Sequence, residues 1–200
     1  SFKREVLIIS KVHHPSILRF IGLSMTSFNG DNKPVIITDF LPNGSLEDIL
    51  ILSHKSCPPT QWNDTMKLIC VYGIASAMSF LHENNIVHRD LKPANILLNQ
   101  FLFPIIADFG LSKDEDMQIS QSGIKGTPLY IAPEVWDPDN DKEIDYKKAD
   151  VYAFSIILYE IYANEKPFAN LTMYKLSQKI CKGERPNISL IEEDPYVRSY

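Results

Sequence analysis

The stretch from residue 88 to residue 95, His-Arg-Asp-Leu-Lys-Pro-Ala-Asn, constrains this chain more than any other part of the sequence. It places a carboxylate (Asp90), an ammonium (Lys92) and a carboxamide (Asn95) close together, directly after an apolar run typical of a helix. Asp90 can accept a proton from a hydroxyl, Lys92 can neutralise a phosphate oxygen, and Asn95 can offer an oxygen to a divalent cation. Phosphoryl transfer requires these groups, because its catalysis consists mostly of positioning and charge neutralisation.

Two further motifs follow, Asp-Phe-Gly at 108–110 and Ala-Pro-Glu at 132–134. One such tripeptide is weak, since it recurs by chance in unrelated proteins, but three motifs in one order are specific. Together they resemble the eukaryotic protein kinases in their Ser/Thr-type form. The Pro-Asn-Gly-Ser-Leu run at 42–46 and the run at 126–134 are most similar to the tyrosine-kinase-like group.

The resemblance implies a role for each polar residue of the catalytic loop. Asp90 would orient the substrate hydroxyl and accept its proton. Lys92 would hold the transferred phosphoryl group, and a lysine here is typical of Ser/Thr kinases. Asn95 and Asp108 would hold Mg²⁺, which takes hard oxygen ligands and keeps water and phosphate in its other positions. The implied reaction moves the γ-phosphoryl group of Mg·ATP to Ser or Thr hydroxyls of protein substrates.

The residues around Thr38 resemble the hinge that holds adenine in protein kinases. Thr38 would be the gatekeeper at the back of the pocket, and backbone groups of Asp39, Phe40 and Leu41 would hydrogen-bond the adenine edge. Leu97 would lie beneath the adenine. On residue type alone, the segment is also compatible with an ordinary loop between two elements, because Pro-Asn-Gly is common turn chemistry.

Residues 1–12 are expected to form an amphipathic helix, because apolar residues recur there at helical spacing. The resemblance identifies it with the kinase C-helix, in which Glu5 would pair with the lysine that holds ATP. The His-His-Pro turn at 13–15 lies where the family has a histidine-containing turn. A glutamate on such a helix is also compatible with a merely solvated side chain.

The residues from 110 to 130 resemble a kinase activation loop. Arg89 would form the basic site for a phosphate on this loop. Ser120 and Ser122 are the favoured regulatory phosphorylation sites, and Ser112 is a further candidate.

Thr127 is also a hydroxyl of this loop, and therefore a possible regulatory residue. It belongs, however, to a Gly-Thr-Pro-Leu-Tyr run that resembles the substrate platform of Ser/Thr kinases. There its hydroxyl would contact Asp90 and Lys92. Both Lys92 and Thr127 therefore indicate a Ser or Thr acceptor.

The resemblance implies an α+β fold, a bilobal kinase domain over 1–200 that is truncated at both ends. Its expected parts are an N-lobe remnant with partial β-structure (1–38), a hinge (39–44) and a mostly helical C-lobe (45–200). Strands are expected at 17–24, 34–38, 96–98 and 104–107, and helices at 1–12, 46–52, 62–83, 145–163 and 171–182.

Asp150 opens an apolar helix that resembles the buried F-helix of kinases. A carboxylate there could simply favour the helix dipole, but the resemblance implies that Asp150 accepts backbone amides of the catalytic loop. Ile9, Phe20, His88 and Phe109 match the four stacked positions that join the two lobes. His88 is therefore expected to pack rather than to act as a base.

The chain departs from the family at both ends. No Gly-x-Gly-x-x-Gly motif occurs, and the lysine that would face Glu5 is absent. The last residues precede the arginine that, in the family, pairs with the glutamate equivalent to Glu134, and Arg185 comes too early for that role. The resemblance covers about two-thirds of a kinase domain, so this chain alone is expected to have little activity.

Net charge and cysteine content set the remaining expectations. A net charge of −5 gives no indication of nucleic-acid binding, and the 3 cysteines are too few and too scattered for a disulfide framework or a metal site. The apolar segment 151–163 is too short to span a bilayer. The expected partners are ATP and protein substrates, without nucleic acid or a membrane segment in this chain. The expected location is cytoplasmic, although a receptor with an extracellular part stays open.

Two alternatives remain from sequence alone. The first is a pseudokinase-like or truncated binding scaffold, which the absent glycine loop favours and the complete catalytic residues disfavour. The second is a small-molecule phosphotransferase on a related fold, which would lack the Gly-Thr-Pro-Leu-Tyr platform and the Ala-Pro-Glu motif. Stabilisation of the folded state by Mg·ATP would distinguish the scaffold from an ATP-binding enzyme.

Overall fold

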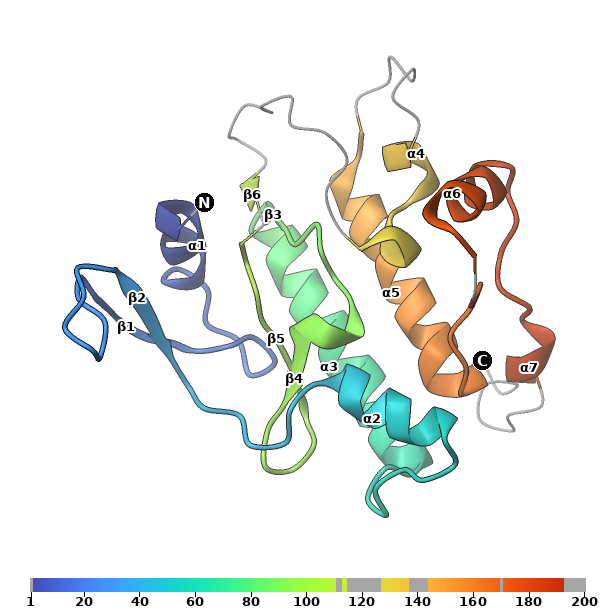
Figure 1. Ribbon diagram of the computed structural model, residues 1–200, viewed down its shortest axis with the longest axis horizontal. Coiled ribbons are helices and arrows are strands. Elements are labelled where there is room, and N and C mark those ends of the chain that lie inside the picture. Colours follow the sequence, from blue (N-terminus) through green and yellow to red (C-terminus); the bar gives the residue numbers. More distant parts are fainter. Residues whose placement is uncertain (1, 111–112, 115–126, 137–143, 170, 193–200) are drawn as a thin grey trace.

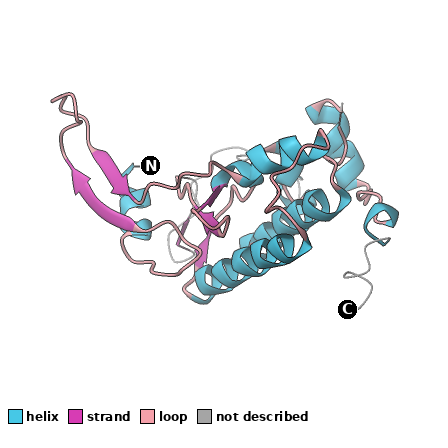
Figure 2. Cartoon of the chain, turned by 90° about the horizontal axis from the view of Figure 1, so that it is seen from below, coloured by secondary structure: helices cyan, strands magenta, loops and turns pink. Residues whose placement is uncertain are grey.

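Helix α1 (Phe2–Ile9) and a two-stranded antiparallel sheet make up the small N-terminal part of the molecule. The sheet pairs β1 (Phe20–Ser24) with β2 (Val35–Thr38). The computed structural model describes residues 2–110, 113–114, 127–136, 144–169 and 171–192. In it, this small part lies to one side of a larger helical part (Figure 1), and the β1–β2 sheet projects away from the helices (Figure 2).

The larger part consists mainly of helices, with short strands and 3₁₀ turns between them. Its helices are α2 (Leu46–His54), α3 (Asp64–Glu83), α4 (Pro133–Trp136), α5 (Tyr146–Ala163), α6 (Met173–Cys181) and α7 (Ser189–Glu192). Its strands are β3 (Ile86–Val87), β4 (Ile96–Leu98), β5 (Pro104–Ile106) and β6 (Lys113–Asp114), and its 3₁₀ turns are η1 (Pro93–Asn95) and η2 (Pro128–Tyr130). Strand β4 pairs antiparallel with β5, and β3 pairs antiparallel with β6.

Side-chain caps begin the helices that support the catalytic loop. Ser45 and Asp48 form a capping box at α2: the Asp48 N–H donates to Ser45 Oγ at 3.3 Å, and the Ser45 N–H donates to Asp48 Oδ2 at 2.8 Å. Asn63 and Asp145 accept backbone N–H groups in the first turns of α3 and α5. Each cap satisfies donors that a helix leaves unpaired at its start, so these boundaries follow from local sequence.

One core cluster joins the small and large parts. Ile9 of α1 belongs to the same buried cluster as Ile74 of α3 and Ile157 of α5. Complete burial of an aliphatic side chain of this size contributes roughly 1.5–3 kcal/mol. The shared cluster therefore holds α1 in a defined position against the helical part.

Helix α3 is long and apolar enough, by length and composition alone, to cross a membrane. The sequence analysis had considered only 151–163 in this respect. Cys70, Ile74 and Ala77 of α3 are nevertheless fully buried against the rest of the fold. Helix α3 is therefore buried like a core helix, and core helices also satisfy this criterion of length and composition.

The α+β fold, with a partial N-lobe and a helical C-lobe, is confirmed, and each predicted helix is present. Most boundaries differ by one or two residues, and two elements differ by more. Helix α1 ends at Ile9 instead of residue 12. The expected strand 17–24 is divided: only its second half pairs with β2, whereas the Leu18 N–H donates to the carbonyl of Ile106 at 2.9 Å. Residues 16–18 thus hydrogen-bond to β5 of the larger part, which sequence periodicity does not reveal.

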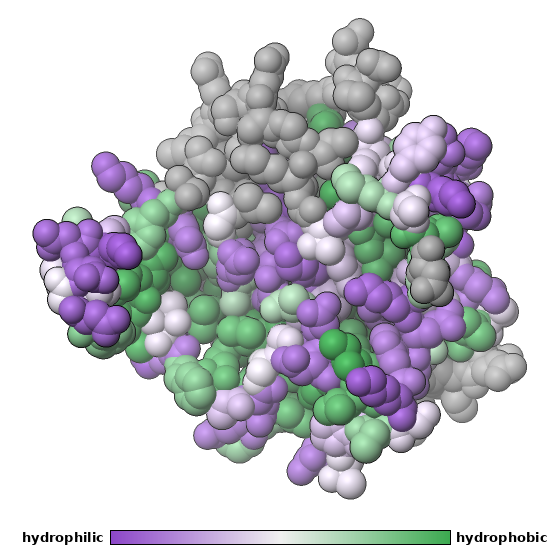
Figure 3. Space-filling view, in the orientation of Figure 1, coloured by the Kyte–Doolittle hydropathy of each residue, from purple (hydrophilic) through white to green (hydrophobic). Residues whose placement is uncertain are grey.

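Strand β1 presents apolar side chains to solvent. Ile21 and Leu23 are 55% and 45% exposed, and Met25 and Phe28, which follow the strand, are 69% and 94% exposed. Figure 3 shows apolar surface along this N-terminal part and extending towards the helical body. An exposed sheet face of this kind is typical of a surface that other segments cover.

Candidate active site

Asp90 lies at the centre of a hydrogen-bond network in the catalytic loop. Lys92 Nζ donates to Asp90 Oδ2 at 2.7 Å, and Asn95 Nδ2 donates to the same oxygen at 3.2 Å. Asn95 Nδ2 also donates to the carbonyl oxygen of Asp90 at 2.8 Å. The Asp90 side chain is only 11% exposed. The carboxylate is therefore held in one orientation and largely shielded from water.

Thr127 completes this network from the distant activation segment. Lys92 Nζ donates to Thr127 Oγ1 at 2.9 Å. The Thr127 N–H donates to Asp90 Oδ1 at 3.2 Å, and its hydroxyl lies 3.4 Å from the same oxygen. The structure thus brings together Asp90, Lys92, Asn95 and Thr127, all of which the sequence analysis singled out.

Asp150 anchors the catalytic loop from α5. Its carboxylate, 3% exposed, accepts the backbone N–H groups of His88 and Arg89, both at 2.8 Å. This anchoring was predicted from the resemblance and is confirmed. Asp150 Oδ2 also lies 3.1 Å from His82 Nε2 at the end of α3, a contact the sequence analysis missed. A buried carboxylate needs several such donors to compensate its lost hydration.

His88 packs rather than serving as a base, as predicted. Its ring lies 5.3 Å from that of the fully buried Phe109, at an interplanar angle of 55°. Its Nε2 lies 3.0 Å from the carbonyl oxygen of Ala107 and donates to it. Ile9 and Phe109 belong to the core cluster against which Phe20 packs, while the contact of all four stacked positions stays a prediction.

Asp108 lies at the exposed edge of the site. Its backbone has φ of 61°, and its Oδ1 accepts the N–H of Gly110 at 3.2 Å. This turn follows β5 directly and exposes the carboxylate while Phe109 is buried. Its exposed position leaves the Asp108 carboxylate accessible to a ligand.

Glu5 of α1 lies within electrostatic reach of Asp108. Burial, and next the negative charge of Asp108, raise the pKa of the Glu5 carboxyl above its ordinary value. The two carboxylates, one from the small part and one from the large part, thus repel each other when both are ionised. An ionised pair in this arrangement is unfavourable without a cation nearby.

The hinge residues connect β2 with α2. Arg19 and Asp39 form a two-point ion pair, with Nε–Oδ2 at 2.9 Å and Nη2–Oδ1 at 2.8 Å, while Phe40 is 88% exposed. The Thr38 hydroxyl lies 3.4 Å from the carbonyl oxygen of Asp39. Because the pair is exposed, it contributes little stability.

Leu41 and Leu97 lie in one small apolar cluster. They pack with Leu18, Ile105 and Ala107, which form its buried centre. The sequence analysis did not assign Leu18 or Ala107 to an adenine site. The apolar strand patterns around these residues predict burial but not which face of the fold they share.

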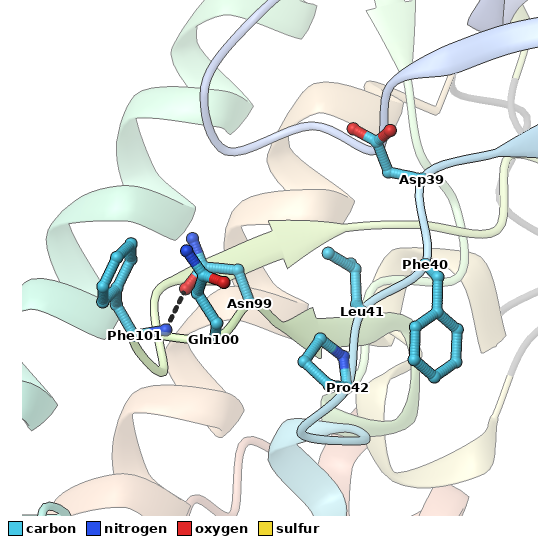
Figure 4. Close-up of a pocket in the computed structure, with 7 residues that line it drawn as sticks. All are labelled: Asp39, Phe40, Leu41, Pro42, Asn99, Gln100 and Phe101. Atoms are coloured by element: carbon cyan, nitrogen blue, oxygen red, sulfur yellow. Dashed lines mark hydrogen bonds between the residues drawn. The ribbon is translucent and has the colours of Figure 1, made fainter.

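An open pocket of about 210 Å³ lies beside the hinge. It is lined by hinge residues and by the turn between β4 and β5, namely Asp39, Phe40, Leu41, Pro42, Asn99, Gln100 and Phe101. In Figure 4, Leu41 and Pro42 face Asn99 and Gln100 across it, while Phe40 points away. None of the catalytic-loop residues lines this pocket, so it is separate from the Asp90 network.

Tyr130 and Glu160 form a buried pair beneath the platform. The Tyr130 hydroxyl donates to Glu160 Oε1 at 2.6 Å. Burial raises the pKa of the Glu160 carboxyl, and burial together with the charge of Glu160 raises the pKa of the Tyr130 phenol. This pair was not predicted from the sequence. The one indication was Glu160 itself, a charged residue within the apolar segment 151–163.

Arg89 contacts Tyr146 of α5, another pair that the sequence analysis missed. The Arg89 guanidinium carbon lies 3.6 Å from the centroid of the Tyr146 ring. The regulatory candidates Ser112, Ser120 and Ser122 lie outside the described residues. Their proximity to Arg89 therefore stays a prediction.

The sequence of this chain matches a protein family and several known proteins. Residues 1–194 match the family described as protein tyrosine and serine/threonine kinase. The chain is 35% identical over 195 residues to the dual specificity protein kinase shkC of Dictyostelium discoideum, covering 94% of this chain and 36% of shkC. It is 37% identical over 175 residues to serine/threonine-protein kinase CTR1 of Arabidopsis thaliana, covering 85% of this chain and 20% of CTR1.

A further relative is serine/threonine-protein kinase STY17 of Arabidopsis thaliana, which is 34% identical over 188 residues. That match covers 94% of this chain and 31% of STY17. The chain thus spans about a third or less of these relatives' own lengths. Because the family match extends over nearly the whole sequence, the chain belongs to the protein tyrosine and serine/threonine kinase family.

Proposed function

We propose that the protein containing this chain is a Ser/Thr protein kinase, which transfers the γ-phosphoryl group of Mg·ATP to Ser or Thr hydroxyls of protein substrates. The observation that carries the proposal is the position of Lys92 Nζ, 2.7 Å from Asp90 Oδ2 and 2.9 Å from Thr127 Oγ1. This lysine links the proposed base to the platform on which an acceptor residue would lie. The relatives named as serine/threonine-protein kinases support the same assignment.

Asp90 is the proposed proton acceptor. Its two oxygens receive hydrogen bonds from different sides, Oδ2 from Lys92 and Asn95 and Oδ1 from Thr127. These contacts orient the carboxylate before substrate arrives, so little reorganisation is needed during the reaction. As the acceptor hydroxyl oxygen bonds to the γ-phosphorus, the bond from that phosphorus to the β,γ-bridging oxygen breaks, ADP leaves, and the hydroxyl proton passes to Asp90. Lys92 then supplies positive charge next to the oxygens on which negative charge is redistributed.

The residues present fit a magnesium site of the kind that phosphates complete. The amide nitrogen of Asn95 donates to Asp90, so its planar carboxamide directs Oδ1 the other way. Asn95 Oδ1 and the exposed carboxylate of Asp108 are hard oxygen donors, as Mg²⁺ prefers. Within the described ranges, no three His, Cys, Asp or Glu side chains gather as a metal cage. Bound there, Mg²⁺ would neutralise phosphate charge.

The proposed acceptor preference rests on two residues. Lys92 lies between the catalytic carboxylate and Thr127, and the Thr127 segment continues into η2 with Leu129 and Tyr130 buried. The threonine therefore forms part of a rigid platform. This supports Ser or Thr over Tyr as acceptor. The printed name of shkC, a dual specificity kinase, makes Tyr the alternative to measure.

The test is phosphate transfer by the full-length protein to three peptides that differ only in carrying Ser, Thr or Tyr as acceptor. We expect Mg²⁺-dependent transfer to Ser and Thr. Asp90→Asn should lower kcat by about a hundredfold or more, because a positioned general base contributes at least that factor. Asp64→Asn, at an exposed site at the start of α3, is the matched control and should retain activity. Transfer to Tyr alone, or transfer that survives Asp90→Asn, would refute the proposal.

A further inference from the structure

The first turns of α5 contact the chain on both sides of β3. Lys147 Nζ donates to Asn85 Oδ1 at 3.0 Å, ahead of β3. Asp150 accepts the backbone N–H of Arg89 at 2.8 Å, after β3. Tyr146 provides a third contact through its ring, which lies 3.6 Å from the Arg89 guanidinium carbon. The side chain and the backbone of Arg89 are therefore both held by one helix.

Both loop residues contacted in this way have a left-handed backbone. Asn85 has φ of 56° and Arg89 has φ of 68°. This region is accessible to asparagine, but it is uncommon for a residue such as arginine, whose Cβ crowds the backbone there. Such a conformation persists only where the surrounding structure holds it. Arg89 immediately precedes Asp90, so its backbone conformation sets the direction in which the Asp90 side chain leaves the loop.

Tyr146 and Asp150 are four residues apart and lie on the same face of α5. A cation within about 6 Å of an aromatic centroid is attracted to the ring face. The Arg89–Tyr146 distance is well inside that limit. Tyr146 is half-buried, so the contact is shielded from part of the solvent.

From these contacts we propose that Tyr146 is a positioning residue for the reaction. Its ring holds the Arg89 side chain and thereby maintains the left-handed backbone that aims Asp90 at Lys92 and Thr127. The inference rests on the proposed kinase function, since Asp90 is taken there as the base. Hydrogen bonds to the Asp90 carboxylate come from Lys92, Asn95 and Thr127, and Tyr146 is proposed to act through Arg89.

The ring, not its volume, is the feature that matters. Tyr146→Phe preserves the aromatic face and removes only the hydroxyl. Tyr146→Leu retains an apolar side chain but has no ring for the guanidinium. If Tyr146 were simply a packing residue, these two variants would behave alike in catalysis.

Two substitutions at Arg89 distinguish the effect of its left-handed backbone from the effect of its guanidinium group. Arg89→Ala removes the guanidinium but leaves the steric cost of the left-handed backbone. Arg89→Gly removes the guanidinium as well, but glycine adopts positive φ without that cost. The positive φ at Arg89 therefore predicts that kcat is higher in Arg89→Gly than in Arg89→Ala.

The experiment measures kcat and KM of the full-length protein with a Ser peptide for the Tyr146 variants, alone and in both Arg89 backgrounds. We expect Tyr146→Leu to lower kcat about tenfold with KM little changed, as loss of a partly buried cation–π contact would. Tyr146→Phe should stay within about twofold of the parent. In the Arg89→Gly background, Tyr146→Leu should have no further effect on kcat.

Equal kcat for Tyr146→Leu and Tyr146→Phe would overturn the inference, as would a tenfold loss from Tyr146→Leu that persists in Arg89→Gly. Urea unfolding of the same variants provides a readout independent of activity, in which the effects of Tyr146→Leu and Arg89→Ala should be non-additive. Additive effects would overturn the proposed contact. Absence of phosphate transfer by the parent protein would instead overturn the proposed function, and the unfolding cycle would still decide the Tyr146 contact.

Discussion

His14, in the turn after α1, makes a separate contact with each of its ring nitrogens. The N–H of Ser16 donates to His14 Nδ1 at 3.1 Å, so that nitrogen carries no proton. The proton therefore resides on Nε2, which lies 3.2 Å from Ser76 Oγ on α3 and donates to it. The ring also stacks on Phe80 with centroids 5.3 Å apart. Neutral His14 thus links the turn after α1 to α3.

The stability of the protein should therefore depend on the charge state of His14. Burial lowers the pKa of His14 below its ordinary value of 6.5. His14 therefore binds a proton less readily in the folded state than in the unfolded chain. Its contribution to the free energy of unfolding is fully present above pH 6.5 and is lost as the pH falls through the pKa of the folded state. Urea unfolding between about pH 7 and pH 5 should show a smaller pH dependence in His14→Asn than in the parent.

His13→Asn is the matched control, because His13 is the exposed neighbour. It should retain the parent's pH dependence. An unchanged slope in His14→Asn would contradict the assignment of His14 as a neutral structural link.

At the level of elements, a close approach of α3 and β5 supports the site. Gly73 lies in the middle of α3, and a Cβ added there would lie 2.6 Å from Pro104 Cγ and 3.1 Å from Ser16 Oγ. Strand β5 leads directly to Asp108, and the carbonyl of Ser16 accepts the N–H of Ile106 at 2.8 Å. Gly73 therefore permits a helix, a strand and the N-terminal connection to meet.

Gly73→Ala should destabilise the protein by about 1–3 kcal/mol, because the added methyl group overpacks this junction. The effect is opposite to intrinsic propensity, since alanine favours a helix interior by about 1 kcal/mol over glycine. Urea unfolding midpoints measure the difference. Gly22→Ala is the control, because a Cβ at Gly22 meets no atom within 4 Å. A gain in stability from Gly73→Ala would show that the helix can move away from β5 without cost.

At the scale of the whole molecule, α1 and the larger part interact electrostatically through two carboxyl groups. The charge of Asp108, in the turn after β5, raises the pKa of Glu5 in α1, and the family resemblance implies a lysine as the partner of Glu5. Glu134 forms no salt bridge with another described residue, and Arg185 instead lies over the Tyr152 ring at 5.6 Å. Glu5 and Glu134 thus form no salt bridge with another described residue.

Glu5→Gln should consequently have opposite effects on stability and activity. In the 200-residue chain it should raise the melting temperature near neutral pH, because it removes repulsion from Asp108 and the cost of burying a charge. In the full-length protein it should lower phosphate transfer, because a lysine partner would lose its counter-charge. Thermal unfolding of the chain and kinase assays of the full-length protein measure the two effects. Glu83→Gln, at the exposed end of α3, serves as the control, and a fall in melting temperature for Glu5→Gln would contradict the repulsion.

Local sequence determined the helices of this protein and the chemistry of its catalytic loop. The capping box at Ser45 and the apolar periodicity around Ile74 act within a few residues, so the sequence predicts α2 and α3 directly. The spacing of Asp90, Lys92 and Asn95 also predicts which functional groups share one loop. The family resemblance added the tie between Thr127 and Asp90 and the anchoring by Asp150.

Contacts between distant segments were decided only by the tertiary structure. The pairs Tyr146–Arg89, Glu160–Tyr130 and His82–Asp150 each join different elements, and no periodicity indicates which face of one element meets another. Likewise, the sequence predicted that Arg89 is charged, but not that its guanidinium lies on a ring while its backbone is left-handed. The physical reason is that local propensity acts over a turn or two, whereas the packing of α5 against the loop depends on the whole core.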